Sequence, residues 1–131
     1  MTQPESAFSL KIQKALKGRG AYVWKVHGNE FTPAGTPDIC GVYHGQFIGI
    51  ESKMPGNKCS PIQEYRIERM RLAGALIVAP CYTIDQALEL LNRLDAAFDL
   101  QPSTRINRSG SVAQSTAWRS LRLDYGIGAK F

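Results

Sequence analysis

The sequence has no long apolar run, and it has little cysteine or histidine with which to bind zinc. No stretch among its 131 residues approaches the roughly 18 apolar residues of a transmembrane helix. Residues 1–13 lack the apolar segment and small-residue cleavage site of a secretory signal. Three cysteines and two histidines show no CxxC or paired Cys/His spacing, which argues against a zinc site and a disulfide framework. We therefore expect reduced thiols, a cytoplasmic location and no membrane partner.

Acidic residues are fewer than basic residues. The chain has 16 Lys and Arg against 11 Asp and Glu, a formal net charge of +5. The positive excess lies in residues 1–82 and 101–131, whereas residues 83–100 are acidic. This distribution is typical of proteins that bind a polyanion such as nucleic acid, and it also fits a solvated basic surface with no specific partner. Charge alone leaves both interpretations open.

Hydrophobic periodicity and turn residues predict seven elements in the order α-β-β-β-α-β-α. The expected elements are a helix over 4–20, a strand over 21–26, two strands within 37–53, a helix within 60–74, a strand over 75–80 and a helix over 83–100. The order predicts an α/β domain over residues 1–100, with a mixed β-sheet flanked by helices. The strand over 75–80 is apolar on both faces, so we expect it at the centre of the sheet.

The C-terminal segment, residues 101–131, differs in composition from the rest of the chain. Residues 101–116 are polar and aperiodic, as in a linker or flexible arm. Trp118, Leu121 and Tyr125 follow at helical spacing, beside two arginines. The segment is either a basic arm that wraps DNA, with an aromatic ring stacked on an unpaired base, or a helix that packs on the domain or on a second subunit.

A predicted hairpin brings two acidic residues together. His44 and Gly45 suit a two-residue turn, in which a residue that tolerates positive φ precedes glycine. Pairing outward from this turn sets Asp38 directly opposite Glu51 on one face of the sheet. Like charges in that position repel each other, and a divalent cation between the carboxylates removes the repulsion.

The residues around this pair predict phosphodiester hydrolysis. Lys53 lies two residues after Glu51 and so projects from the same face, where it can orient or deprotonate a water molecule. Gln63 lies in the first turn of the predicted helix within 60–74, from which its amide can bind that water or a phosphate oxygen. Oxygen ligands with open water positions suit Mg²⁺ or Mn²⁺. A third acid, Glu5, extends the buried stripe of the first helix, or is simply an acid favoured by the helix dipole.

Basic residues elsewhere are candidate contacts for the nucleic-acid backbone. They are Lys11, Lys14, Lys58, Arg66 and Arg69. His27 ends a strand beside the loop over 27–36, where it either touches DNA or is an ordinary surface residue. The loop itself precedes Asp38 and is a candidate to line the DNA groove.

These motifs together resemble a known nuclease family. The sequence has PD at 37–38 and ESK at 51–53, as in the PD-(D/E)XK nuclease signature. Glu5, GTPDICGV, FIGIESK, SPIQ and RLAGALIVAP resemble, in that order, the virus-type replication-repair nuclease (VRR-NUC) domain over residues 4–95. The resemblance implies a PD-(D/E)XK restriction-endonuclease-like core and a metal-dependent DNA nuclease, as found in phages and bacteria.

The resemblance also implies roles for individual residues. Glu5, Asp38 and Glu51 would bind Mg²⁺, the backbone carbonyl of Ser52 would add a ligand, and Lys53 and Gln63 would assist catalysis. Relatives that resemble Holliday junction resolvases imply a homodimer acting on branched DNA, either four-way junctions or flaps.

The sequence is also compatible with two other functions. The first is a catalytically inactive module that keeps the nuclease fold and binds DNA, although an inactive protein would not need Glu51 and Lys53. The second is a sequence-specific restriction-type nuclease, which is less favoured because no added recognition domain is found within the 131 residues.

Overall fold

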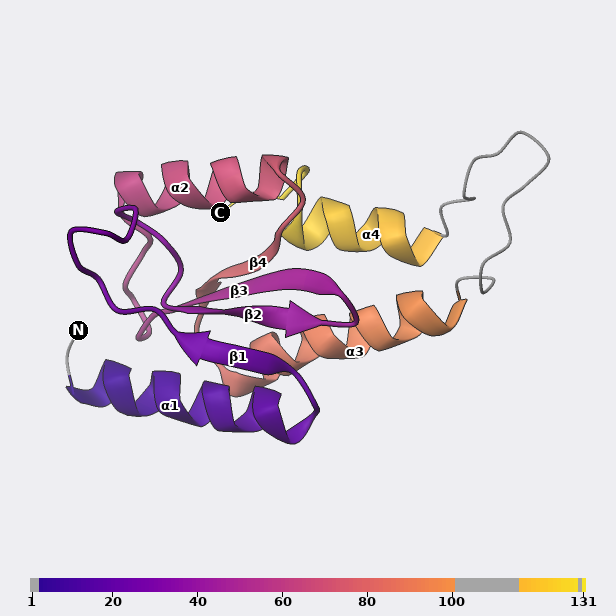
Figure 1. Ribbon diagram of the computed structural model, residues 1–131, viewed down its shortest axis with the longest axis horizontal. Helices are drawn as coiled ribbons and strands as arrows, with labels where there is room; N and C mark the ends of the chain where they lie inside the picture. Colours follow the sequence, from indigo (N-terminus) through magenta and orange to yellow (C-terminus); the bar gives the residue numbers. More distant parts are fainter. Residues whose placement is uncertain (1–2, 101–115, 130) are drawn as a thin grey trace.

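The computed structural model describes residues 3–100, 116–129 and 131, which form a four-stranded mixed sheet flanked by helices (Figure 1). The elements are α1 Gln3–Gly18, β1 Tyr22–Lys25, β2 Ile39–Tyr43, β3 Gln46–Ser52, α2 Pro61–Leu72, β4 Leu76–Cys81, α3 Ile84–Leu100 and α4 Thr116–Tyr125. The predicted order of seven elements and the predicted α/β fold class are therefore confirmed, with α4 following them. None of the helices in the described ranges is long and apolar enough to cross a bilayer.

The sheet has the strand order β1-β2-β3-β4, and β4 lies at its edge. The first three strands pair antiparallel, whereas β4 pairs parallel with β3. The prediction of a central position for this strand was wrong. Helices bury both faces of β4: Ile77 packs in a core cluster with Ile67 of α2, and Leu76 packs in the cluster that includes α3 and α4. Apolar residues on both faces of a strand therefore indicate that both faces are covered, here by helices, and do not tell whether strands pair with one of its edges or with both.

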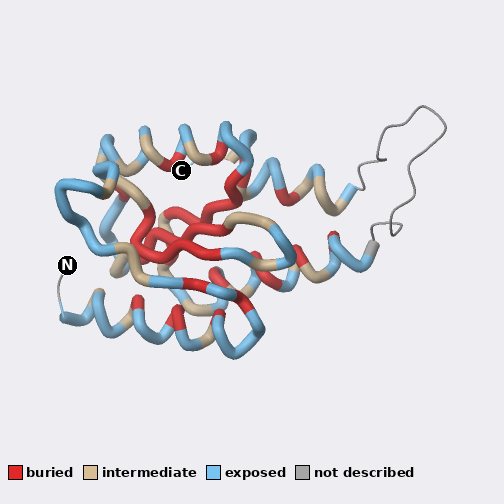
Figure 2. The backbone as a smooth tube through the Cα atoms, viewed as in Figure 1, coloured by how far each residue is buried: buried red, intermediate tan, exposed pale blue. Residues whose placement is uncertain are grey.

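The main core lies on the face of the sheet opposite α2. Helices α1, α3 and α4 contribute to it together with all four strands, and Figure 2 shows the buried backbone concentrated in the sheet. Ile12 and Leu16 of α1 are fully buried there, as the predicted apolar stripe requires. Helix α2 covers the other face through a smaller cluster around Ile67. The three cysteines are buried and unpaired, as expected of reduced thiols.

The hairpin between β2 and β3 has the predicted register. Tyr43 pairs with Gln46, and the ladder continues outward to the pair of Ile39 and Ile50. His44 and Gly45 both have positive φ, 50° and 74°, as a two-residue hairpin turn requires. His44 also stacks on Phe98 of α3, with ring centroids 4.4 Å apart. Its assignment as a turn residue is therefore confirmed.

Helix α4 packs against α3 and β4 in the main core. Leu121 is fully buried, and the guanidinium of Arg71 donates a hydrogen bond of 2.9 Å to the carbonyl of Tyr125. Of the alternatives for Trp118, Leu121 and Tyr125, packing on the domain is the one observed. Most of the predicted polar linker, 101–116, lies outside the described residues, and the division of the chain at residue 100 stays a prediction.

The packing of α4 predicts unequal costs for two neighbouring leucines. Leu121 has no exposed surface, whereas Leu123 is 63% exposed. We expect Leu121→Ala to lower the free energy of unfolding by about 2–4 kcal/mol, because it leaves a cavity in the core. Leu123→Ala should change it by less than about 0.5 kcal/mol. Urea unfolding followed by circular dichroism measures both, and equal costs would contradict the packing of α4.

Candidate active site

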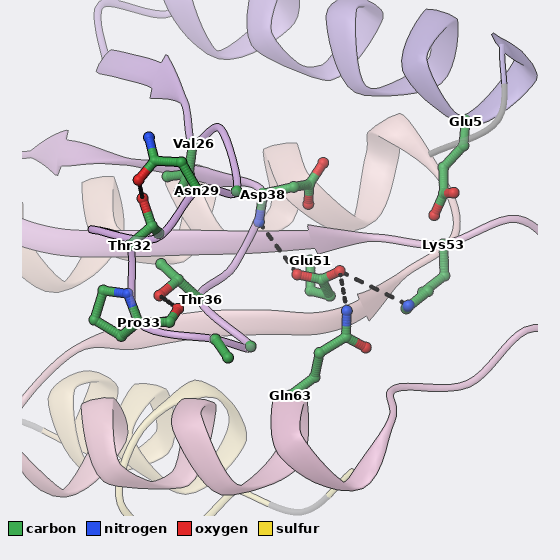
Figure 3. A pocket seen from close by; sticks show the side chains of 13 residues that line it. Glu5, Val26, Asn29, Thr32, Pro33, Thr36, Asp38, Glu51, Lys53 and Gln63 are labelled. Carbon is green, nitrogen blue, oxygen red and sulfur yellow. Dashed lines mark hydrogen bonds and ion pairs between the residues drawn. The ribbon is translucent and has the colours of Figure 1, made fainter.

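A pocket of about 560 Å³ opens where β2 begins and β3 ends. The N-terminal ends of α1 and α2 and the loop over 27–36 lie on this side of the molecule (Figure 1). The pocket is lined by the five predicted side chains Glu5, Asp38, Glu51, Lys53 and Gln63 (Figure 3). These residues come from two helices, two strand ends and a connecting loop. The fold therefore brings together residues that are far apart in the sequence.

Asp38 and Glu51 are neighbours, as the hairpin register predicts. The ladder ends with Ile39 opposite Ile50, one residue before the two acids. The backbone N–H of Asp38 donates to Oε2 of Glu51 at 3.1 Å. The pairing of β3 with β4 shifts register between Ile50 and Ser52, as in a β-bulge. Bulges beside functional sites redirect side chains, and this one lies at the acidic residue of β3.

The carboxylate of Glu51 is buried beside another negative charge. Its residue is only 4% exposed. Burial and the charge of Asp38 raise the pKa of Glu51 to about 8, although Lys53 and the backbone hydrogen bond from Asp38 act in the opposite direction. The nearby positive charges thus offset only part of the free-energy cost of ionising Glu51 beside Asp38.

Lys53 lies beside Glu51 at the end of β3. Its Nζ is 3.8 Å from Oε1 of Glu51, and its side chain is 14% exposed. The backbone N–H of Lys53 donates to the carbonyl of Cys81 at 2.9 Å, which ties this end of the chain to β4. The predicted projection of Lys53 from the face of Glu51 matches this geometry.

Gln63 connects the start of α2 to the acid pair. Ser60 caps the helix, and Oε1 of Gln63 accepts a hydrogen bond of 2.9 Å from the backbone N–H of Ser60, completing a capping box. Nε2 of Gln63 donates to Oε1 of Glu51 at 3.1 Å. The amide of Gln63 therefore caps the helix through its oxygen and binds the carboxylate of Glu51 through its nitrogen.

Asp38 receives hydrogen bonds from Ser52 and from two residues, Lys25 and Ser9, that the sequence did not assign to the site. Nζ of Lys25 lies 2.9 Å from Oδ2 of Asp38, and Oγ of Ser9 donates to the same oxygen at 3.0 Å. The hydroxyl of Ser52 also donates to Oδ2, and the backbone N–H of Ser52 donates to Oδ1 at 2.7 Å. The predicted contribution of Ser52 was its carbonyl, whereas the hydrogen bonds found here use its N–H and hydroxyl.

A pattern in α1 could have identified Ser9. Glu5, Ser9 and Gln13 recur every four residues, so they form a polar line along one side of the helix. Ser9 and Gln13 are buried in spite of being polar. Buried polar side chains need partners, which points to a polar site facing the helix. No comparable pattern marks Lys25.

The loop over 27–36 forms one wall of the pocket, and its predicted contact with DNA stays a prediction. Its conformation depends on Gly35, which has a φ of +82°. A Cβ at Gly35 would lie 2.4 Å from the carbonyl oxygen of Ile62, so only glycine lets the loop approach α2 this closely. Nε of Arg66 donates to the carbonyl of Ala34 at 3.1 Å. Both contacts fix the wall to the helix that carries Gln63.

Glu5 lies farther from the acid pair. Its side chain extends from α1 toward the region of Glu51 and Lys53 (Figure 3). Within the described residues, no group of three or more Asp, Glu, His and Cys side chains is close enough to hold one metal ion. The site therefore presents two adjacent carboxylates, and Glu5 lines the same pocket apart from them.

The predicted DNA-contacting residues lie outside the pocket lining. Lys11, Lys14, Lys58 and Arg69 are exposed, and Arg66 is half-buried. The two lysines of α1 and the two arginines belong to the helices that supply Glu5 and Gln63. His27 is exposed and lines an adjoining cleft together with Ser9 and Lys25.

The donor atoms of the pocket fit a hard divalent cation. Both carboxylates supply oxygen atoms, which Mg²⁺ and Mn²⁺ prefer. Oδ1 of Asp38 receives the hydrogen bond from Ser52, and a carboxylate oxygen has two acceptor positions, so a further position remains in principle. The raised pKa of Glu51 reflects its burial and, after that, the charge of Asp38, and a cation bound there would favour the ionised carboxylate.

Comparison with known proteins identifies the fold. The sequence matches no protein-family model and no curated protein. Among solved structures, a VRR_NUC domain is similar over 70% of this chain and 97% of its own length, with 22% sequence identity and a TM-score of 0.57. The chain therefore has the fold of a VRR-NUC domain, as its motifs predicted.

The raised pKa of Glu51 predicts how the free energy of unfolding of the metal-free protein depends on pH. Below pH 4.5 the carboxyl is protonated in both the folded and the unfolded chain. Between pH 4.5 and about 8 only the unfolded chain loses its proton, so this residue makes stability fall as pH rises. In EDTA, Glu51→Gln should therefore be more stable than the wild type at pH 8, by an amount on the order of 3 kcal/mol. The difference should shrink toward pH 5.

Urea unfolding at several pH values measures this difference. Glu68→Gln is the matched control, because Glu68 is an exposed acid of α2 outside the pocket. It should follow the wild type at each pH. A Glu51→Gln variant that also follows the wild type would show that the carboxyl titrates at an ordinary pKa.

Proposed function

We propose that this protein is a metal-dependent DNA endonuclease that hydrolyses phosphodiester bonds, with Mg²⁺ as its cation and Mn²⁺ as a substitute. One observation carries the proposal: Asp38, Glu51 and Lys53 meet in one pocket with Glu5 and Gln63. The fold of a VRR-NUC domain supports it, because the same motifs of this chain resemble that nuclease family.

In this proposal the acid pair holds the cation. Asp38 and Glu51 would supply carboxylate oxygens and the backbone carbonyl of Ser52 a further ligand, and Glu5 of α1 lines the same pocket. A divalent cation bound there would polarise a phosphate oxygen and lower the pKa of a nearby water molecule. Gln63 holds Glu51 through the hydrogen bond of 3.1 Å, so that the carboxylate keeps its orientation toward the pocket.

Lys53 assists the hydrolysis of the phosphodiester bond in this proposal. Its ammonium lies beside Glu51 and faces the same pocket, where it can orient the attacking water and offset the negative charge that develops on the phosphate. The water oxygen forms a bond to phosphorus and loses a proton to solvent. The bond from phosphorus to the leaving sugar oxygen breaks, and that oxygen takes up a proton.

The helices beside the pocket favour a polyanionic substrate. The N-terminal ends of α1 and α2 carry partial positive charge and lie on the same side as the pocket (Figure 1). Lys11 and Lys14 on α1 and Arg66 and Arg69 on α2 add formal charge, and Lys58 precedes α2. These residues would bind the DNA backbone and position a phosphodiester over the acid pair.

Branched DNA is the proposed substrate, and a homodimer the proposed active form. The resemblance of the motifs to VRR-NUC nucleases supports four-way junctions or flaps. Symmetric cutting of a junction needs two active sites related by a two-fold axis, which a homodimer supplies.

Cleavage of labelled DNA tests the proposal. Four-way junction, flap and linear duplex of matched sequence are incubated with Mg²⁺, Mn²⁺ or EDTA, using the wild type, Glu51→Ala and Glu68→Ala. We expect cutting with either metal and none in EDTA. Glu51→Ala should reduce the rate by about 100-fold or more, because it removes one of the acids that hold the cation. Glu68→Ala should cut at the wild-type rate.

The other outcomes have distinct meanings. Cutting that persists in EDTA would contradict the metal requirement. Binding of junctions without cleavage in either metal would favour the inactive DNA-binding module. Paired symmetric nicks in the junction, together with a dimeric mass by light scattering, would support the proposed assembly.

A further inference from the structure

A cation of the protein contacts one of the two carboxylates of the candidate metal site. Lys25, the last residue of β1, places its Nζ 2.9 Å from Oδ2 of Asp38. The two side chains are 21% and 8% exposed, so solvent screens this ion pair only partly. Lys25 also lowers the pKa of Glu51, so its charge acts on both acids.

The two oxygens of Asp38 have unequal surroundings. Oδ2 receives hydrogen bonds from Lys25, Ser9 and the hydroxyl of Ser52, whereas Oδ1 receives one from the N–H of Ser52. A carboxylate oxygen has about two acceptor positions, so the three donors crowd Oδ2. A divalent cation that binds Asp38 therefore meets both a crowded oxygen and a positive charge.

We infer that Lys25 is an internal counter-ion of the acid pair, and that a divalent cation displaces it from Asp38. This inference rests on the proposed function, because it concerns the same site. Without metal, Lys25 pairs with the carboxylate of Asp38 and fixes its orientation. When metal binds, the ammonium and the divalent cation repel each other, and the ammonium leaves Oδ2.

The structure has space for the displaced side chain. A second cleft of about 530 Å³ adjoins the pocket and shares Val26 and Gly28 with it. Its lining includes Lys25 itself and the polar side chains of Ser9, Gln13 and His27. The ammonium can thus move into a polar, open cleft.

Removal of Lys25 should therefore have opposite effects on folding and on metal binding. The protein without metal loses the cation that neutralises its acids, so its stability falls. The metal no longer competes with a fixed charge, and Ser9 and Ser52 still orient Asp38, so its affinity rises. If Lys25 only supported the local structure, its removal would loosen the site and weaken metal binding instead.

Two measurements without DNA test this. Isothermal titration with Mg²⁺ and then Mn²⁺ gives the affinity, and urea unfolding in EDTA gives the stability. We expect Lys25→Met to bind Mg²⁺ about tenfold more tightly than the wild type and to unfold at lower urea. Lys25→Arg keeps the charge and should bind within about threefold of the wild type. Ser9→Ala removes a neutral donor to the same oxygen and should not tighten binding.

A spectroscopic measurement covers the case in which Lys25→Met does not fold. The side-chain ammonium and ε-carbon resonances of Lys25, assigned by their absence in Lys25→Arg, should shift when Mg²⁺ is added to the wild type. Mg²⁺ binding with no shift of these resonances, or with no tighter binding by Lys25→Met, would overturn the inference and leave the proposed function standing. Absence of Mg²⁺ and Mn²⁺ binding in the wild type and in Lys25→Met would overturn both.

Discussion

Two carboxylates held side by side at the ends of paired strands are the interaction on which the rest of the site depends. Asp38 and Glu51 repel each other when both are ionised, and burial adds to the cost of ionising Glu51. The neighbouring groups reduce it in different ways. The backbone N–H of Asp38 and the amide of Gln63 bind Glu51, while Lys25 and Ser52 bind Asp38. The local fold is thus organised to keep two like charges together, which is an arrangement suited to binding a cation.

The acid pair could be predicted because local rules determine it. A two-residue turn at His44 and Gly45 and the two-residue period of strands fix the pairing of Asp38 with Glu51, and no distant contact is needed. The start of α2 was predictable for the same reason, since Ser60, Pro61 and Gln63 form a capping pattern within four residues. The fold class followed from the order of such locally determined elements.

Features that depend on packing between distant segments could not be predicted in this way. Lys25 meets Asp38 because β1 lies beside β2, and nothing near Lys25 in the sequence marks that neighbour. The apolar sequence of β4 reflects the helices that cover both of its faces, and it does not tell how many strands pair with its edges. The docking of α4 through Leu121 joins segments separated by residues 101–115.

The tight turn of the hairpin limits how this part of the chain can vary in length. Because pairing is counted outward from His44 and Gly45, each residue added to β2 must be matched by one added to β3 if the acids are to stay opposed. While the turn keeps two residues, the number of residues between Asp38 and Glu51 in the sequence can therefore change only by two at a time. A single inserted residue would have to be absorbed as a bulge or a longer turn. Related sequences that keep both acids should differ in hairpin length accordingly.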